Sequence, residues 1–153
     1  YKNRIYVTVG GDIWWGKQEC WLKCIDANGT GDITETGEIW SSSLERHSAA
    51  TPAISNGLIY VTDCGKNLYC FDAENGKQYN KHFLRQDSWS SALAADEKVF
   101  VGSRGSDFWI IEQGKNLNVL DSINFDSPIH ATPATANGVL YISTMNRLYA
   151  IQK

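Results

Sequence analysis

The sequence predicts an all-β protein assembled from a repeated unit of short antiparallel strands. Two observations predict it: short apolar runs are separated by turns rich in Gly, Asn and Pro, and apolar residues at helical spacing are absent. Residues 51–72 show the pattern most clearly, because two apolar runs flank Asn56-Gly57 and a third follows a Gly-Lys-Asn turn. Asn-Gly supplies the positive φ angles that a tight hairpin requires, so this stretch is predicted to form three consecutive strands.

The same pattern returns along the chain. The aromatic residue of the second strand recurs at Tyr6, Tyr60, Phe100 and Tyr141. The last three are 40 and 41 residues apart, and the first gap of 54 places an insertion of about 14 residues in the first repeat. Third strands are expected at 22–26, 68–72, 108–112 and 148–152, and fourth strands at 38–44, 77–84 and 117–125. Hairpin turns are expected at Asn56-Gly57, Asp96-Glu97 and Asn137-Gly138. Four short strands per period predict the blades of a β-propeller, whereas a β-sandwich would not repeat in this way.

The repeats divide the chain into about four blades of four strands, of which the first and last are incomplete. The expected blades cover about residues 1–45, 46–86, 87–127 and 128–153. The first lacks its innermost strand and the last lacks its fourth strand. Incomplete rings expose apolar blade faces, which folded proteins seldom tolerate. We therefore expect the C-terminal half of a longer propeller, or a homodimer that completes a ring of about eight blades.

The composition disfavours two classes of partner. Net charge is −3 and no block of Lys or Arg occurs, whereas nucleic acid and anionic membrane surfaces both require a basic face. No apolar run approaches the roughly 18 residues that a membrane span needs. The sequence therefore predicts no nucleic-acid partner and no membrane span.

The four cysteines are expected to be free structural thiols. Cys20 and Cys24 lie four residues apart on a predicted strand, which places their Cα atoms roughly 13 Å apart, too far for a disulfide. Cys64 and Cys70 flank a hairpin turn and could approach each other. One disulfide or a metal site are the alternatives, although the spacings fit no common zinc pattern.

Two repeats carry a motif that resembles the pyrroloquinoline-quinone-like (quinoprotein-like) β-propeller repeat family. Its signature is Ala-x-Asp-x-x-Thr-Gly-x-x-x-Trp, in which the Trp docks between blades. The second blade reads Cys-Phe-Asp-Ala-Glu-Asn-Gly over 70–76, with Asn80 where the Trp belongs. The first blade reads Cys-Ile-Asp-Ala over 24–27 and, after an insertion, ends at Trp40, one place early. The third blade lacks the motif.

The resemblance carries expectations about location and cofactor. The family includes quinoprotein alcohol and glucose dehydrogenases, the outer-membrane assembly lipoprotein and many extracytoplasmic bacterial proteins. It therefore implies a periplasmic or otherwise extracytoplasmic location. The dehydrogenases hold pyrroloquinoline quinone with an adjacent Cys pair and a Glu/Asn/Asp set that binds calcium. No Cys-Cys dipeptide occurs here, so the resemblance does not by itself predict a quinone cofactor.

Candidate ligand-binding residues gather on the loops that join the fourth strand to the next blade and the second strand to the third. First strands begin near Ala49, Trp89 and His130, and the inserted stretch 10–17 contains two adjacent tryptophans. Exposed aromatic side chains beside His and Arg suit stacking on a ring, a peptide or a sugar. The candidate set is Trp14, Trp15, His47, Trp89, Arg104 and His130. The alternatives are that the two tryptophans pack on a neighbouring blade or a second subunit, and that the histidines are simply hydrogen-bonded.

A second candidate is a weak calcium loop. Asp26, Asn28 and Asp32 partly match the spacing of a calcium-binding loop, but Gly37 stands where the bidentate Glu belongs. Asp and Asn in such turns usually bond to their own backbone instead.

No catalytic set of side chains is predicted. The sequence therefore predicts a non-catalytic binding or scaffold module for a protein, peptide or saccharide ligand. The alternative is a fragment of a quinoprotein-like oxidoreductase whose cofactor ligands lie outside this chain.

Overall fold

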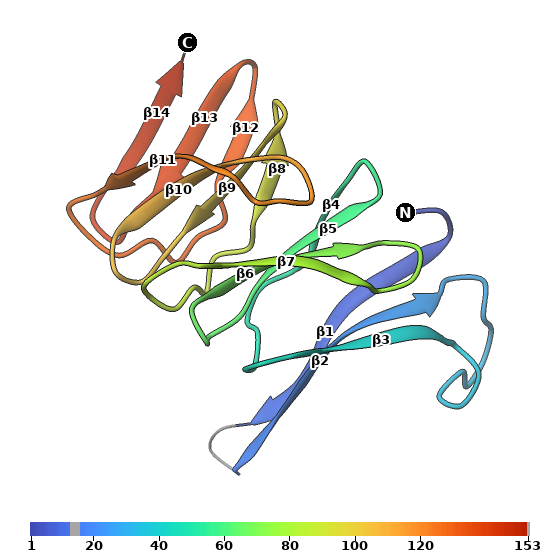
Figure 1. The fold of residues 1–153 in the computed structure, drawn as a ribbon. Helices are drawn as coiled ribbons and strands as arrows, with labels where there is room; N and C mark the ends of the chain where they lie inside the picture. The colour runs from blue at the N-terminus through green and yellow to red at the C-terminus, as the bar shows by residue number, and fades with distance from the viewer. Residues whose placement is uncertain (13–15, 153) are drawn as a thin grey trace.

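The computed structural model describes residues 1–12 and 16–152, and these residues form strands and no helix (Figure 1). The described strands pair into four antiparallel sheets of three, four, four and three strands in chain order, which confirms the all-β prediction of partial propeller blades. The first sheet contains β1 (Arg4–Asp12), β2 (Lys17–Asp26) and β3 (Glu38–Leu44). The second contains β4 (Ala53–Ser55), β5 (Leu58–Thr62), β6 (Asn67–Asp72) and β7 (Gln78–Phe83). The third contains β8 (Leu93–Ala95), β9 (Lys98–Gly102), β10 (Asp107–Glu112) and β11 (Val119–Asn124). The fourth contains β12 (Ala134–Ala136), β13 (Val139–Ser143) and β14 (Leu148–Gln152).

Tight hairpin turns recur where the sequence predicts them. The pairs Asn56-Gly57, Asp96-Glu97 and Asn137-Gly138 all have positive φ angles, between 50° and 75°. Lys2-Asn3, with φ angles of 50° and 55°, forms a turn of the same kind, and the Arg4 N–H donates to the Tyr1 carbonyl at 3.0 Å. Lys2 is not a residue that favours positive φ, so the sequence pattern alone missed the turn at Lys2-Asn3.

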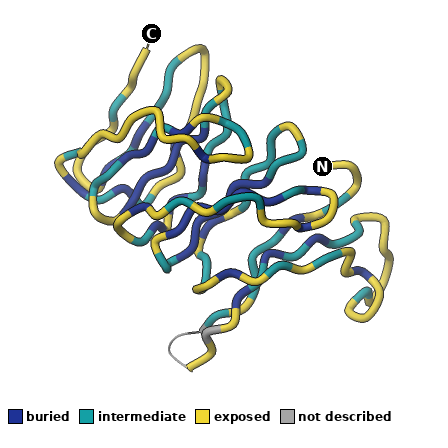
Figure 2. Tube along the Cα trace, in the orientation of Figure 1, coloured by how far each residue is buried: buried dark blue, intermediate teal, exposed yellow. Residues whose placement is uncertain are grey.

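The sheets pack face to face, and a core cluster lies at each of the three junctions (Figure 2). Between the first two sheets, Tyr6 packs with Tyr69 and Phe71, and its hydroxyl donates to the Ala73 carbonyl at 3.0 Å. At the next junction Tyr60 takes the equivalent place, and its hydroxyl donates to the Gly114 carbonyl at 3.5 Å. The first two junctions are thus joined by apolar packing and by a hydrogen bond to a turn of the following sheet, whereas at the third junction Phe100 takes this place and packs without a hydroxyl.

The docking position of the family motif is occupied differently in its two copies. Trp40 lies opposite Cys24 in the strand register, and Asn80 lies opposite Cys70, so the two positions are equivalent in space. The Trp40 indole N–H donates to the Ala73 carbonyl at 3.3 Å. The Asn80 amide donates to the carbonyl of Asn116 at 2.7 Å. Asn80 therefore keeps a hydrogen bond to the next sheet but lacks the ring packing that Trp40 provides. Trp40 stands one place early in the sequence motif, yet the strand register puts it at the position equivalent to Asn80.

A sheet face is buried only where another sheet covers it. Leu68 and Leu148 occupy equivalent positions on β6 and β14, yet Leu68 is 0% exposed and Leu148 is 69% exposed. The third sheet covers Leu68, whereas within the described chain no sheet follows the fourth. The strands of the fourth sheet therefore present an apolar face to solvent. None of the described residues form a helix that is long and apolar enough to cross a bilayer.

The third and fourth sheets meet closely at Gly102, which lies at the end of β9. A Cβ atom at this position would lie 2.2 Å from Cγ2 of Ile129 and 2.7 Å from its Cβ. Ile129 is fully buried in the third core cluster. The missing side chain of Gly102 therefore lets the fourth sheet pack against the third.

We predict that Gly102→Ala lowers the free energy of unfolding by about 1–3 kcal/mol, the usual cost of overpacking a core. Gly114→Ala is the matched control, because a Cβ there meets nothing within 4 Å, and its effect should stay within about 1 kcal/mol. Chemical denaturation measures both. In Gly102→Ala/Ile129→Ala the combined loss should be smaller than the sum of the two single losses. Wild-type stability of Gly102→Ala would contradict the packing argument.

Candidate functional site

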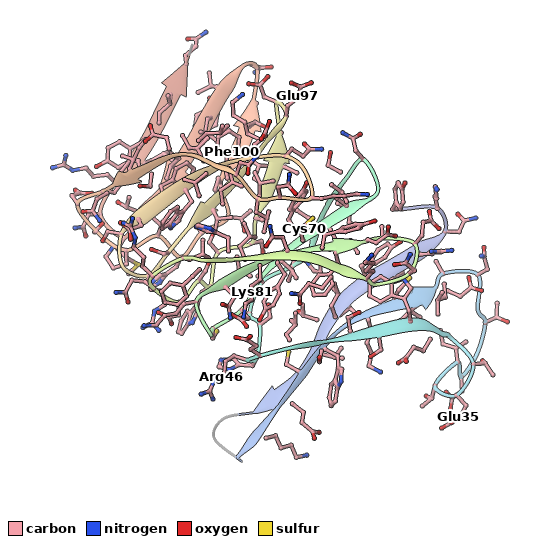
Figure 3. The ribbon with its side chains drawn as sticks, in the orientation of Figure 1. Glu35, Arg46, Cys70, Lys81, Glu97 and Phe100 are labelled. Atoms are coloured by element: carbon pink, nitrogen blue, oxygen red, sulfur yellow. The ribbon has the colours of Figure 1, made fainter. Side chains whose placement is uncertain are left out.

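One end of the sheets carries every loop that leads from one sheet to the next, together with the turns between second and third strands. We call this end the loop face, and its described segments are 45–52, 63–66, 84–92, 103–106, 125–133 and 144–147. The hairpin end lies opposite and contains the two-residue turns at 56–57, 96–97 and 137–138. Figure 3 shows Arg46 at the loop face, and Glu35 and Glu97 away from it at the hairpin end.

The loop face is held in the same way in three sheets. The backbone N–H groups of Cys64, Arg104 and Met145 each donate at 2.9 Å to a carbonyl of the preceding inter-sheet loop, on His47, Asp87 and Pro128 respectively. The three donors are 40 and 41 residues apart, so they occupy equivalent places in successive sheets. Side chains at these places, and at the starts of the first strands, are therefore presented by a fixed backbone.

Three of the predicted ligand-binding residues come together on this face. The guanidinium carbon of Arg104 lies 4.3 Å from the centre of the Trp89 ring. The rings of Trp89 and His130 lie 5.4 Å apart between centroids, inclined by 41°. Arg104 also pairs with Asp87, Nη1 to Oδ2, at 2.8 Å. We call Trp89, Arg104 and His130, together with Asp87, the Trp89 cluster.

The Trp89 cluster is held together by contacts within the protein and remains open to solvent. Trp89 is 45% exposed although Arg104 stacks on it, an unusual exposure for a large aromatic side chain. The stack joins the third sheet to the fourth, because Trp89 precedes β8 and His130 precedes β12. A ligand here would meet an aromatic surface and a planar cation whose positions are already fixed.

Two further residues extend the site and were not singled out from the sequence. Met145 occupies the place of Arg104 in the fourth sheet and is 62% exposed. Cys64 occupies that place in the second sheet and is half-buried. Burial raises the pKa of the Cys64 thiol, Asp87 raises it further and Arg104 lowers it, so the sulfur lies within electrostatic reach of the Asp87–Arg104 pair. The spacing of 40 and 41 residues from Cys64 to Arg104 to Met145 is the signal that could have found them.

The remaining predicted residues do not join the cluster. His47 packs against the first sheet, since a Cβ on Gly11 would lie 2.3 Å from the His47 Cβ, and the Nδ1 atom of His47 is buried without a hydrogen-bond partner. Its role is therefore one of packing beneath the loop. Trp14 and Trp15 lie outside the described residues.

The site offers stacking, charge and hydrogen bonding. The nearby serines serve the scaffold: the Ser88 hydroxyl donates to the Gly102 carbonyl at 2.8 Å and the Ser90 hydroxyl to the Ala131 carbonyl at 3.0 Å. Among residues 1–12 and 16–152, no group of three or more His, Cys, Asp or Glu side chains converges to hold a metal ion.

The calcium candidate lies at the hairpin end. Asp26 Oδ1 accepts hydrogen bonds from the backbone and side chain of Asn28, at 2.9 and 2.8 Å. Asp32 Oδ1 accepts from the backbone and hydroxyl of Thr34, at 3.0 and 2.7 Å. Both carboxylates thus stabilise their own turns.

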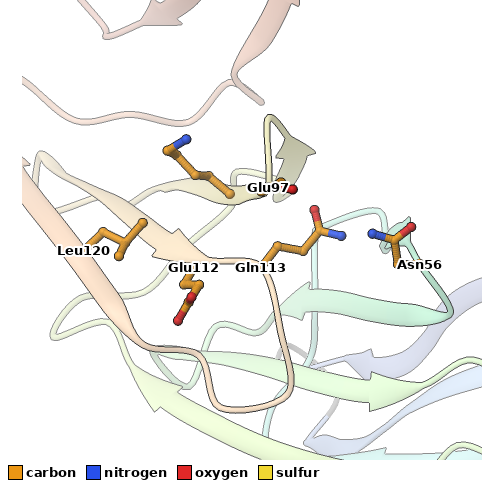
Figure 4. A pocket seen from close by; sticks show the side chains of 6 residues that line it. Asn56, Glu97, Glu112, Gln113 and Leu120 are labelled. Atoms are coloured by element: carbon orange, nitrogen blue, oxygen red, sulfur yellow. The ribbon is translucent and has the colours of Figure 1, made fainter.

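A shallow hollow of about 340 Å³ at the hairpin end contains two more carboxylates, on Glu97 and Glu112 (Figure 4). The Asn118 amide donates to Glu112 at 2.7 Å. This carboxylate therefore also serves a local contact.

Comparison with known proteins identifies the repeat. A family model described as outer membrane protein assembly factor BamB matches residues 22–120. BamB from Moraxella catarrhalis superposes with a TM-score of 0.72 at 16% identity, over 89% of this chain and 43% of that one. A quinohemoprotein alcohol dehydrogenase from Pseudomonas putida HK5 gives 0.57 at 21% identity, over 66% and 17%. A europium-containing methanol dehydrogenase gives 0.58 at 17% identity, over 78% and 23%. No curated protein sequence matches significantly.

These identities show a shared fold, and the chain spans less than half the length of each of these structures. The residues present do not fit the quinone that the dehydrogenase resemblance implies. No two cysteines are adjacent in the sequence, and no acidic group of three converges in the described chain.

We predict that Cys64 is the first thiol to be alkylated in the folded protein, because Cys20, Cys24 and Cys70 are at most 1% exposed. Asp87 raises the Cys64 pKa, so Asp87→Asn should lower it, increase the thiolate fraction at pH 8 and speed the reaction. Arg104→Gln should raise the pKa and slow the reaction. Mass spectrometry after timed iodoacetamide treatment measures both rates. Asp121→Asn, on β11, is the control and should leave the rate unchanged. Earlier modification of a buried cysteine would contradict the prediction.

Proposed function

This chain belongs to the propeller-repeat family of the outer membrane protein assembly factor BamB, and we propose from this premise that it is a non-catalytic, extracytoplasmic binding module. In the proposal, the loop face receives a protein partner and the Trp89 cluster is the centre of the contact. The rest of the chain acts as the scaffold that holds these side chains in place.

The stack of Arg104 on the exposed Trp89 carries this proposal. Trp and Arg are the residues that most often dominate the binding energy of protein interfaces, and exposed Met is enriched there as well. Trp89, Arg104 and Met145 are all substantially exposed at one end of the sheets. Because backbone hydrogen bonds hold these loops, less loop entropy is lost on binding.

A protein partner fits this site better than a saccharide. Sugars stack on an open aromatic face, whereas Arg104 already covers a face of Trp89 at 4.3 Å. The name of the family, an outer membrane protein assembly factor, supports both a protein partner and an extracytoplasmic location. The alternative oxidoreductase would need cofactor ligands from outside this chain.

A photocrosslinking amino acid tests the proposal in the full-length protein in its native cells. Placed at Met145, it should yield one discrete crosslinked protein, whereas Asn137, an exposed residue at the hairpin end, should yield none. Trp89→Ala should reduce the Met145 crosslink at least about tenfold, because truncating an interface Trp commonly costs 2 kcal/mol or more.

Leu120→Ala is the control for this experiment, since Leu120 is similarly exposed but lies on β11 near the hairpin end, and it should leave the crosslink unchanged. Equal crosslinking from both positions would refute the proposal. So would dye reduction by the purified protein with added pyrroloquinoline quinone and calcium, because that result would favour the oxidoreductase.

A further inference from the structure

Arginine is distributed unevenly between the two ends of the sheets. The chain contains five arginines, and four of them, Arg46, Arg85, Arg104 and Arg147, lie on the loop face. The fifth, Arg4, begins β1 next to a hairpin turn. Lys66 adds a further cation to the loop face. Arg104 lies within the proposed contact centre, the Trp89 cluster, and Arg147 lies two residues from Met145.

The carboxylates of the loop face already have partners within the protein. Glu45 pairs with Lys81, and Asp87 pairs with Arg104. Asp126 lies 3.3 Å from Nε of Arg147 and accepts a hydrogen bond from the Tyr149 hydroxyl. The fourth carboxylate, Asp63, is fully buried and accepts a hydrogen bond from the Tyr69 hydroxyl at 2.7 Å.

The arginines keep surface available for an incoming anion. Arg104 meets Asp87 through Nη1 and Arg147 meets Asp126 through Nε, so each pair occupies one edge of a guanidinium that carries several N–H donors. The side chains of Arg104 and Arg147 are 41% and 68% exposed. A planar guanidinium with an open edge binds a carboxylate through two parallel hydrogen bonds.

The hairpin end has the opposite character. Its turns and the adjoining strand ends carry most of the carboxylates of the chain: Asp26, Asp32, Glu35, Glu38, Asp72, Glu74, Asp96, Glu97 and Glu112. Glu38, Glu74 and Asp96 pair with Lys23, Lys2 and Lys98, and carboxylates still outnumber cations at this end. On the loop face cations outnumber carboxylates, so an acidic partner is favoured there over the hairpin end.

We infer that the segment docked on the loop face is an acidic peptide of the partner protein, in which Asp or Glu side chains alternate with apolar ones. Its carboxylates bind Arg104 and Arg147, and an apolar side chain packs on Trp89 and Met145. This inference rests on the proposed function and specifies the chemistry of the partner.

Binding of synthetic peptides to the full-length protein tests this inference. The probes are a fluorescent peptide of alternating Asp and Leu, its Asn–Leu counterpart and a Lys–Leu peptide. We expect the Asp peptide to bind at least about tenfold more tightly than the other two at low salt. Its affinity should fall several-fold between 50 and 300 mM NaCl, since the exposed charges are then screened.

Substitutions locate the contact on the protein. Arg104→Gln/Arg147→Gln should weaken binding of the Asp peptide at least about tenfold, and Lys98→Gln/Lys115→Gln at the hairpin end should not change it. Asp87→Asn should tighten binding, because it removes the internal competitor for Arg104. If the arginines only stabilised the fold, Asp87→Asn would not increase the affinity for the Asp peptide.

Three results would overturn the inference: equal affinity for the Asp and Asn peptides, no effect of the arginine substitutions, or full competition by phosphatidylglycerol vesicles, which would point to a membrane surface. The crosslinking experiment distinguishes a failure of this inference from a failure of the proposed function. If the Met145 crosslink persists but joins a non-acidic segment, only the acidic chemistry is wrong. If that crosslink is absent, the loop-face contact itself is wrong.

Discussion

The structure depends on one constraint: a sheet of three or four short strands has an apolar face that only a neighbouring sheet can bury. The equivalent residues Leu68 and Leu148 show its strength, because the first is completely buried and the second is mostly exposed. Tyr6 and Tyr60 join neighbouring sheets in two ways. Their rings fill the space between the sheets, and each hydroxyl donates to a backbone carbonyl of the next sheet. The stability of each sheet is therefore largely the stability of its junctions, as in other repeat proteins.

The same junctions determine the geometry of the candidate site. Trp89 belongs to the third sheet and His130 to the fourth, so the distance between their rings is a property of the junction rather than of either loop. Ile129 packs into the space left by Gly102 and immediately precedes His130. A change in the packing of Ile129 would therefore move His130 relative to Trp89. The site is rigid to the extent that the core beneath it is well packed.

Much of the fold could be predicted from the sequence because period, alternation and turn residues act locally. The aromatic residues Tyr60 and Phe100 and the Asn56-Gly57 turn define strands without reference to distant residues. The site could be predicted only in part. Equivalent positions in the repeat brought Trp89 and His130 to the same face, but the pairing of Arg104 with Asp87 depends on how two loops of different sequence meet. No spacing in the sequence reports such a contact.

The charged side chains at the two ends of the sheets differ in what they do for the fold. At the hairpin end, Asp26 and Asp72 each accept backbone hydrogen bonds that stabilise a turn, so their charge is partly a by-product of turn geometry. Arginine has no comparable role in forming a turn. Arg85 packs over the buried Trp109 and so serves the scaffold, whereas Arg104 stacks on an exposed Trp89, a contact that the turns of the loops do not require. Side chains that the fold does not require, placed on a backbone that the fold holds still, are the ones whose chemistry reflects a partner.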